Sequence, residues 1–405
     1  ERHMNRTAWV IVAGAAIITI AMGVRGTFGI FMLPLSAEHG VSITVLSFSL
    51  ALQNLVWGIV QPVAGALSDR HGAGRVIAVG GVLYALGLYV AVSFSEPIMI
   101  MLGAGILIGL AQSCTTFSVV LGVIGRRVSE QRRPMALGIA SAGGSFGQMS
   151  IIPMAQGLME VGGFEFSLLC LAALAFIVIP LAVPMAGKPT EEAAGGAPGP
   201  KEALPDVIKG AAVHKGYILL TLGFFTCGFQ IAFITVHLPV YLLNCGLPMH
   251  VNPATLAATA LATVGFFNMI GTYAHGALGG RYRMKNLLAI NYVLRGVFIM
   301  AFFLAPKTEA TVLIFSVGMG LLWLGTVPLT SGVVAKMFGP ENLGMLFGLC
   351  FFSHQVGSFL GVYIGGAMFD LNGNYDLIWI LTALAGFMAA ALNYPIKERL
   401  VAQPA

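Results

Sequence analysis

Charged side chains are scarce in this sequence of 405 residues. Only 9% of the residues are Asp, Glu, Lys or Arg, whereas a typical soluble domain has about 25%. Hydrophobic residues make up 57% of the chain, and the mean hydropathy is +0.88. Because so little charge cannot cover a water-facing surface, these values exclude a soluble globular protein. They indicate a protein whose main solvent is lipid.

Metal-binding and catalytic motifs are absent from the sequence as well. No two of the five cysteines have the spacing of metal ligands or of a disulfide framework. There is no His-Glu-x-x-His, no phosphate-binding Gly-x-x-x-x-Gly-Lys and no pattern typical of a Ser-His-Asp triad. We therefore expect no metal site, no cofactor and no enzymatic activity.

Long apolar stretches recur along the entire sequence. A helix needs roughly 20 apolar residues to cross a bilayer, and continuous apolarity differs from the alternating pattern of transmembrane strands. The sequence therefore predicts an all-α membrane protein with twelve transmembrane helices. Their expected positions are 9–33, 42–67, 75–94, 98–123, 135–159, 166–186, 217–243, 254–277, 286–305, 310–333, 343–368 and 376–394.

One long hydrophilic stretch divides the chain into two halves. Residues 187–215 are rich in Pro, Gly, Ala and charge, a composition typical of a flexible linker. The linker separates an N-terminal six-helix bundle (1–186) from a C-terminal six-helix bundle (216–405). Two similar stretches, GALSDRHGAGR at 65–75 and GALGGRYRMK at 276–285, indicate that the halves are an internal repeat.

Lys and Arg gather in the loops of one predicted side. If the N-terminus is cytoplasmic, 18 of the 21 basic residues lie on the cytoplasmic side, and only Lys307 lies in an outer loop. The positive-inside rule then predicts a multi-pass protein of the inner (plasma) membrane with both termini in the cytoplasm. The net charge of +5 reflects this loop bias, so nucleic acid is not an expected partner.

The stretch at 65–75 resembles the loop signature of the major facilitator superfamily, in which a small residue, an acid, basic residues and glycine follow one another. Twelve spans and a central linker extend the resemblance over the whole chain, and they imply the major facilitator fold. The resemblance further implies a cytoplasmic gate in which Asp69 pairs with basic residues of its own and the neighbouring loop, here Arg70, Arg75 and Arg133. In the second copy Gly280 stands where the acid would be.

A narrower resemblance begins at RRPMALGIASAGGSFG, residues 132–147. This stretch is similar to the monocarboxylate transporter family and its relative, the oxalate/formate antiporter, in which a basic pair precedes a helix with small residues on one face. Gly143 and Gly147 stand four residues apart, which lets a neighbouring helix approach closely. The resemblance implies a small organic anion as substrate. Thr272 occupies the position at which that family usually has a carboxylate-binding arginine.

Acidic residues are missing from the interior of every predicted span. All 16 Asp and Glu residues fall in loops, in the linker or at span ends, so no carboxylate is available in mid-membrane as the proton site that many carriers use. Two arginines do lie within spans, although a charge near the bilayer centre costs about 2.5–3.5 kcal/mol. Arg25 is on the first span, which lines the cavity in the fold implied above, and its planar guanidinium matches a carboxylate. We expect an anionic substrate to complete that pair, whereas Arg295, on a peripheral span, snorkels or bonds backbone carbonyls.

Histidines and polar residues supply the remaining candidate site. Without membrane acids, histidine is the side chain left that titrates near neutral pH, so His237 and His354 are the predicted proton carriers and substrate contacts. His275 lies at a span end. The other predicted substrate-binding residues are Phe28, Gln112, Thr116, Gln148, Gln230, Asn268, Thr272, Trp323 and Gln355. The alternative for each is an ordinary interhelical hydrogen bond or packing contact.

Together these features predict a secondary transporter that works as a monomer surrounded by membrane lipid. It would move a small organic anion of the monocarboxylate type by alternating access, either in symport with protons or in exchange for a counter-anion. The alternative is a drug or antibiotic efflux carrier of the same superfamily. Such carriers usually have a Gly-x-x-x-Gly-Pro run and a membrane acid, and here residues 143–148 read GGSFGQ. The repeated filter motifs of channels are absent from the sequence.

The gate at 65–75 generates a first prediction. Asp69→Asn removes the charge that would pair with the loop arginines, so we expect it to leave folding largely intact and to weaken transport. The measurement is uptake of a small carboxylate by vesicles containing each protein, with thermal unfolding as the folding control. Uptake at the wild-type rate would contradict a gating role for Asp69.

Overall fold

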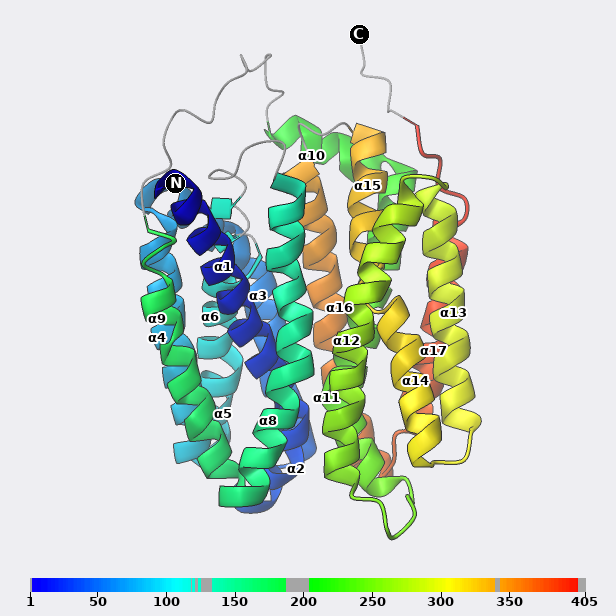
Figure 1. The fold of residues 1–405 in the computed structure, drawn as a ribbon. Helices are drawn as coiled ribbons and strands as arrows, with labels where there is room; N and C mark the ends of the chain where they lie inside the picture. Colours follow the sequence, from blue (N-terminus) through cyan, green and yellow to red (C-terminus); the bar gives the residue numbers. More distant parts are fainter. Residues whose placement is uncertain are drawn as a thin grey trace.

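The structure, a computed structural model, describes residues 2–117, 119–120, 123–124, 133–186, 204–338 and 343–399. These residues are helical almost throughout, and no strand occurs among them. The start of the first helix and the described segment after the last helix lie at the same end of the molecule (Figure 1). We call this end the terminal end and the other the opposite end.

The first half of the chain, blue through teal to the green helix beside α9 in Figure 1, packs as one bundle of helices. Its helices are α1 (Arg2–Gly26), α2 (Phe28–His39), α3 (Ile43–His71), α4 (Ala73–Ser93), α5 (Pro97–Ile100), the π-helix η1 (Met101–Leu107), α6 (Ile108–Thr115), α8 (Arg133–Phe176) and α9 (Val178–Leu181).

The second half, green to red, forms the other bundle. Its helices are α10 (Leu204–Val213), α11 (Lys215–Asn244), α12 (Pro253–Gly279), α13 (Met284–Leu304), α14 (Glu309–Leu322), α15 (Thr326–Phe338), α16 (Leu343–Asn372) and α17 (Asp376–Asn393).

The prediction of twelve membrane crossings is confirmed. Eleven helical segments among the described residues are long and apolar enough to cross a bilayer, and one of them, Ala142–Leu181, has 40 residues. At 1.5 Å per residue such a segment is about twice the thickness of the hydrocarbon core. Gly163, with φ +83° and ψ 174°, interrupts its helical geometry. The segment is therefore two antiparallel crossings joined at a glycine whose positive φ disfavours other residues.

The predicted flexible linker is partly wrong. Within 187–215, Leu204–Val213 forms α10, which lies across the terminal end of the molecule, at the top of the view (Figure 1). Its sequence, LPDVIKGAAV, alternates apolar and polar residues at helical spacing, a pattern that favours a helix lying along a surface. Residues 187–203 of the linker are outside the described part of the chain.

Glycine brings two pairs of helices into backbone contact. A Cβ added at Gly143 of α8 would lie 2.5 Å from the Ala15 carbonyl oxygen of α1, and one at Gly147 would collide with the next turn of α1. In the second half, Gly357 and Gly361 of α16 face the backbone of α11 equally closely. Since real Cβ contacts are longer than 3.0 Å, only glycine fits at these positions. The close approach predicted from Gly143 and Gly147 is confirmed, and the same device recurs in both bundles.

The two bundles meet along the opposite end and the middle of the molecule. A Cβ on Gly29 of α2 would lie 2.5 Å from the Thr235 carbonyl oxygen of α11. Towards the terminal end, Cβ atoms at Gly65, Gly276 and Gly348 would meet no described atom within 4 Å. Among the described residues, the contact between the halves is therefore close at the opposite end and loosens towards the termini.

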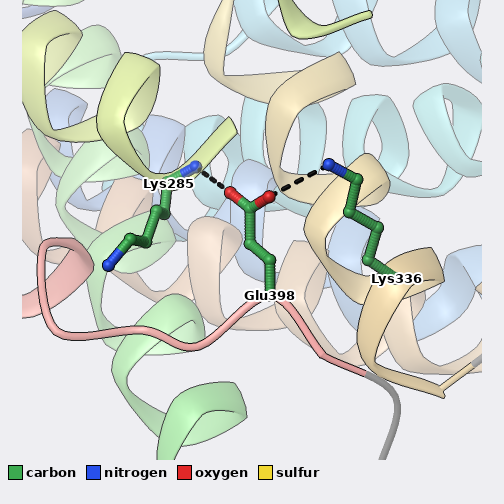
Figure 2. A network of polar contacts seen from close by, with 3 residues as sticks. All are labelled: Lys285, Lys336 and Glu398. Atoms are coloured by element: carbon green, nitrogen blue, oxygen red, sulfur yellow. Dashed lines mark hydrogen bonds and ion pairs between the residues drawn. The ribbon is translucent and has the colours of Figure 1, made fainter. Parts of the chain in front are cut away.

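A carboxylate at the terminal end holds the tail of the chain against the second bundle. Figure 2 shows Glu398 between α13 and α15. Its Oε1 accepts a hydrogen bond from the backbone N–H of Lys285 at 2.6 Å, and its Oε2 forms an ion pair with Lys336 Nζ at 3.0 Å. The Lys285 ammonium donates to the Tyr394 carbonyl at 2.8 Å. Through Glu398, the segment after α17 is thus attached to the start of α13 at Lys285 and to the end of α15 at Lys336.

Arg295 supports a break in the tenth crossing. The helix stops at Leu322 and resumes at Thr326, which leaves carbonyls without helical partners in a medium that offers none. The Arg295 side chain is fully buried. Its Nε and Nη2 donate to the Leu322 carbonyl at 2.9 and 2.7 Å, Nη2 also donates to the Trp323 carbonyl, and Nη1 donates to Cys227 Sγ at 3.2 Å. Of the two roles expected for this arginine, the structure shows bonding to backbone carbonyls.

This arrangement predicts a loss of stability in Arg295→Met. The substitution keeps most of the apolar bulk but removes the side-chain donor of the Trp323 carbonyl and leaves the Leu322 carbonyl with only the Asn291 amide, at 3.3 Å. Each buried group that loses its donor costs about 1–3 kcal/mol. We expect the free energy of unfolding to fall by about 2–4 kcal/mol, measured by denaturant unfolding in detergent. The control is Arg281→Met, since Arg281 is exposed. Equal stability of the two variants would contradict the supporting role.

Candidate functional site

Arg25 lies where the first crossing is interrupted. It occupies the last turn of α1, one residue before Gly26 and the break that precedes α2. Its Nη2 donates a hydrogen bond to Asn54 Oδ1 on α3, and its guanidinium carbon lies 5.2 Å from the centre of the Trp57 ring. Its buried Nε has no hydrogen-bond partner among the described residues. The side chain is only partly buried. The guanidinium is therefore held in place while part of its hydrogen-bonding capacity remains unused.

A chain of hydrogen bonds in the first bundle supports this arrangement. Trp57 Nε1 donates to Thr116 Oγ1 at 3.0 Å, and Thr116 Oγ1 donates to the Gln112 carbonyl at 2.6 Å. The Gln112 amide donates to the Tyr84 hydroxyl at 2.6 Å and to the Ala21 carbonyl at 3.0 Å. Gln112 and Thr116 are fully buried. Their geometry therefore favours support of Trp57 and α1 over direct contact with a substrate.

Asn54 and Trp57 were not among the residues that the sequence singled out. They lie three residues apart on α3, so they share one face of the helix. An asparagine within a long apolar span was the available signal, because an amide in lipid needs a partner. The sequence did not reveal that this face of α3 points towards Arg25.

Aromatic rings continue from Arg25 into the second bundle. Trp57 meets Phe351 of α16 edge to face, with ring centres 5.6 Å apart. Phe351 in turn stacks on His354 at 5.6 Å, with an angle of 5° between the ring planes. His354 Nδ1 is hydrogen-bonded to Gln355 Oε1 at 3.2 Å, and Gln355 Nε2 is buried without a described partner. The structure thus brings Arg25, His354 and Gln355 to one interface between the bundles.

Gln148 of α8 also lies beside this interface. Its Cγ is 4.0 Å from where a Cβ on Gly26 would stand, next to Arg25. Its Nε2 is buried and has no hydrogen-bond partner among the described residues. A second unpaired donor therefore belongs to a residue that packs against Gly26, the neighbour of Arg25 in the chain.

His237 has a different environment from His354. It is completely buried, with Nδ1 hydrogen-bonded to the Tyr375 hydroxyl and Nε2 to the Val362 carbonyl, both at 2.8 Å. Both ring nitrogens are thus occupied by partners within the second bundle. This geometry favours the structural alternative for His237.

The remaining predicted contacts lie in other parts of the structure. The Asn268 amide donates to Ser145 Oγ at 2.9 Å and its oxygen accepts from Thr272 at 3.0 Å, so this pair helps to join α12 to α8. Gln230 donates to the Thr382 carbonyl at 2.9 Å. Trp323 contributes its carbonyl to Arg295, and Phe28 is buried in the apolar core. Each of these five residues has the bonding or packing role that was the alternative to substrate contact.

The predicted cytoplasmic gate is described only in part. Arg75 is exposed near the start of α4. The side chains of Asp69, Arg70 and Arg133 lie outside the described part of the structure. Within the described residues, no cluster of three or more His, Cys, Asp or Glu side chains could hold a metal ion.

Comparison with known proteins agrees with this architecture. Residues 14–327 match the sequence model of the Major Facilitator Superfamily. The uncharacterized MFS-type transporter YcxA of Bacillus subtilis is 25% identical, over 93% of this chain and 92% of that protein. Monocarboxylate transporter 13 of Rattus norvegicus is 26% identical, over 92% and 85% of the two chains, and monocarboxylate transporter 11 of Homo sapiens is 26% identical, over 92% and 79%.

A solved structure shares the fold. The bacterial homologue of the human lysosomal transporter Spinster, in its inward-facing and occupied conformation, superposes with a TM-score of 0.75 at 14% identity. The superposition covers 98% of this chain and 99% of the other. Since the family model matches most of the sequence and the twelve crossings form two pseudo-symmetric bundles, the chain belongs to the major facilitator superfamily, whose members are multi-pass membrane transporters and not enzymes.

Proposed function

We propose that the protein is a secondary transporter of a small organic anion and that Arg25 binds the carboxylate. The observation that carries this proposal is the contrast between the two arginines within the membrane. Arg295 is fully buried and all of its nitrogens donate to backbone carbonyls, a thiol or an amide. Arg25 has one neutral hydrogen-bond partner and an unpaired Nε. A carboxylate can take the Nε–H and one Nη–H side by side, which supplies the charge that no side chain in the membrane supplies.

The surroundings of Arg25 suit a small amphipathic acid. Gln148, which packs against Gly26 next to Arg25 in the chain, has an unpaired amide donor. Trp57 and Phe351 offer ring faces and edges for an apolar tail between the two bundles. The names of two relatives, monocarboxylate transporters 13 and 11, support a carboxylate as the substrate class.

In this proposal His354 carries the coupling proton. It is slightly exposed and stacks on Phe351, which contacts Trp57 beneath Arg25. A proton on His354 would therefore accompany the anion on Arg25 at one interface, as in symport. Transport by exchange with a counter-anion needs only Arg25, so the two coupling modes differ in their dependence on His354.

The proposed orientation places the terminal end in the cytoplasm of a cell with this protein in its inner membrane. The positive-inside rule supports this orientation, because the sequence assigns 18 of the 21 basic residues to the side of the termini. The bundles at about 1–186 and 216–405 would rock about the Arg25 interface in a functional monomer, as other carriers of this fold do.

Arg25→Lys tests the carboxylate site. Lysine keeps the charge but cannot reproduce the planar fork, so we expect affinity for a short monocarboxylate such as lactate to fall at least about tenfold, or about 1.4 kcal/mol. The measurement is isothermal calorimetry on the purified protein, with lactamide as the uncharged ligand and Arg281→Lys as the control variant. Unchanged lactate affinity in Arg25→Lys, or equal binding of lactamide to the wild type, would contradict the proposal.

His354→Gln and His237→Gln separate the two histidines. We expect His354→Gln to lose accumulation of lactate driven by a pH gradient while lactate exchange continues, because exchange carries no net proton. His237→Gln should keep both activities and unfold at a lower temperature, because it disturbs two buried hydrogen bonds. Vesicle transport with and without a pH gradient measures the first effect, and thermal unfolding the second. Gradient-driven accumulation at the wild-type level in His354→Gln would argue for exchange or for another proton carrier.

A further inference from the structure

An acid of the second bundle is hydrogen-bonded to the start of a helix of the first bundle at the opposite end. Asp370, in the last turn of α16, accepts a hydrogen bond from the backbone N–H of Thr44 at 2.7 Å and another from the Thr44 hydroxyl. The same hydroxyl also donates to the Gly366 carbonyl at 3.3 Å. Thr44 is the second residue of α3, after the N-cap Ser42. The carboxylate therefore sits where the unpaired N–H groups and the partial positive charge of α3 are concentrated.

The reciprocal contact joins an acid of the first bundle to a helix start of the second. Glu160, beside the turn at Gly163 in α8, accepts a hydrogen bond from Thr255 Oγ1 at 2.9 Å. It also accepts one from Gln156 Nε2 of its own helix at 3.0 Å. Thr255 lies in the first turn of α12, whose N-cap is Asn252. Here too a carboxylate faces the N-terminus of a helix that belongs to the other bundle.

The two contacts are related by the pseudo-twofold symmetry of the fold. Helix α3 is the second crossing of the first bundle, and α12 is the second crossing of the second. Asp370 ends the fifth crossing of the second bundle, and Glu160 ends the fifth crossing of the first. Each contact therefore joins a second crossing to the fifth crossing of the other half. Repetition of one interaction at both symmetry-related places indicates that it serves the closure of this end, and not only the local fold of one loop.

We propose that Thr44–Asp370 and Glu160–Thr255 are a pair of latches that hold the opposite end of the transporter closed. Both latches connect the two bundles across the surface at which α2 and α11 touch through Gly29. Rocking of the bundles to open this end must separate each acid from its threonine. The proposal requires the alternating motion of the fold, but it requires neither Arg25 nor any particular substrate.

The strength of such latches suits a gate that opens repeatedly. Asp370 and Glu160 are both exposed, so water replaces much of what each carboxylate loses on opening. An exposed carboxylate at a helix N-terminus shifts an equilibrium by about two- to fivefold. Two independent latches would multiply to about four- to 25-fold, which holds the end closed without locking it.

The test measures how often the opposite end opens in the absence of any ligand. Ser47 is completely buried on α3, one helical turn from Thr44, and faces Gly366 of α16. In the full-length protein, Ser47→Cys provides a thiol that a membrane-impermeant maleimide reaches only when this end opens. Mass spectrometry of the peptide that contains residue 47 separates its labelling from that of the native cysteines. Thr235→Cys on α11 is a second reporter, used in parallel.

We expect Asp370→Ala and Glu160→Ala each to raise the labelling rate about two- to fivefold and the double variant to raise it by about the product. The matched control is Glu165→Ala, which removes an exposed acid five residues after Glu160, beyond the turn at Gly163, without breaking any described contact between the bundles. Unchanged labelling of both reporters in the two latch variants would overturn the proposal. So would an equal rise in Glu165→Ala, since the effect would then follow surface charge and not the latches. Because no substrate is present, either outcome is independent of the Arg25 proposal.

Discussion

The hydrocarbon interior of a membrane offers no hydrogen bonds, and the arrangement of this protein follows from that constraint. Its crossings are nevertheless interrupted near the middle, between α1 and α2, after α6 and between α14 and α15. Each interruption frees backbone groups that need partners. Arg295 supplies them for α14. In α1, the side chains of Gln112 and Tyr84 both donate to the Ala21 carbonyl, about one turn before the break. Arg295 is thus explained by the break that it supports.

The same constraint distinguishes a supporting side chain from a functional one. A polar group in lipid whose partners are all protein atoms is complete, as His237 and Gln230 are. A polar group that has been brought to an interface between the bundles and lacks a partner has room for a ligand. Arg25 and Gln148 meet this description, and their unpaired nitrogens lie on helices that move relative to the second bundle in a rocking transporter. Incomplete hydrogen bonding, and not the mere presence of polarity, is therefore the better guide to the site.

The sequence predicted the fold well because its signals are long and repeated. Runs of about 20 apolar residues gave twelve crossings, and the spacing of Gly143 and Gly147 gave a close helix contact that the structure contains. Individual site residues were harder, because a span that is apolar on every side does not show which way a given side chain points. Gln112 and Thr116 lie on a crossing that was expected to line the cavity, yet they face Tyr84 and Trp57 within their own bundle. Asn54 and Trp57 belong to a crossing on which no substrate contact was predicted, although an asparagine within an apolar span was a signal of one. The prediction of a flexible linker was partly wrong for a related reason, because a ten-residue amphipathic helix is a weak signal inside a stretch rich in Pro and Gly.

The glycine contacts of α1 with α8 and of α11 with α16 have a consequence for how the protein tolerates change. Where two backbones touch, there is no rotamer to adjust and no side-chain tip to move aside, so even a methyl group acts as a wedge between the helices. The two helices of each pair therefore cannot shift easily relative to each other, and each pair moves as one rigid unit within its bundle. Substitutions at these glycines, which stand four residues apart, are therefore strongly destabilising. On the lipid-facing sides of the same helices, one apolar residue can replace another at little cost in stability. Glycine thus gives each bundle the rigidity to rock as a unit, and in return these positions cannot accept another residue.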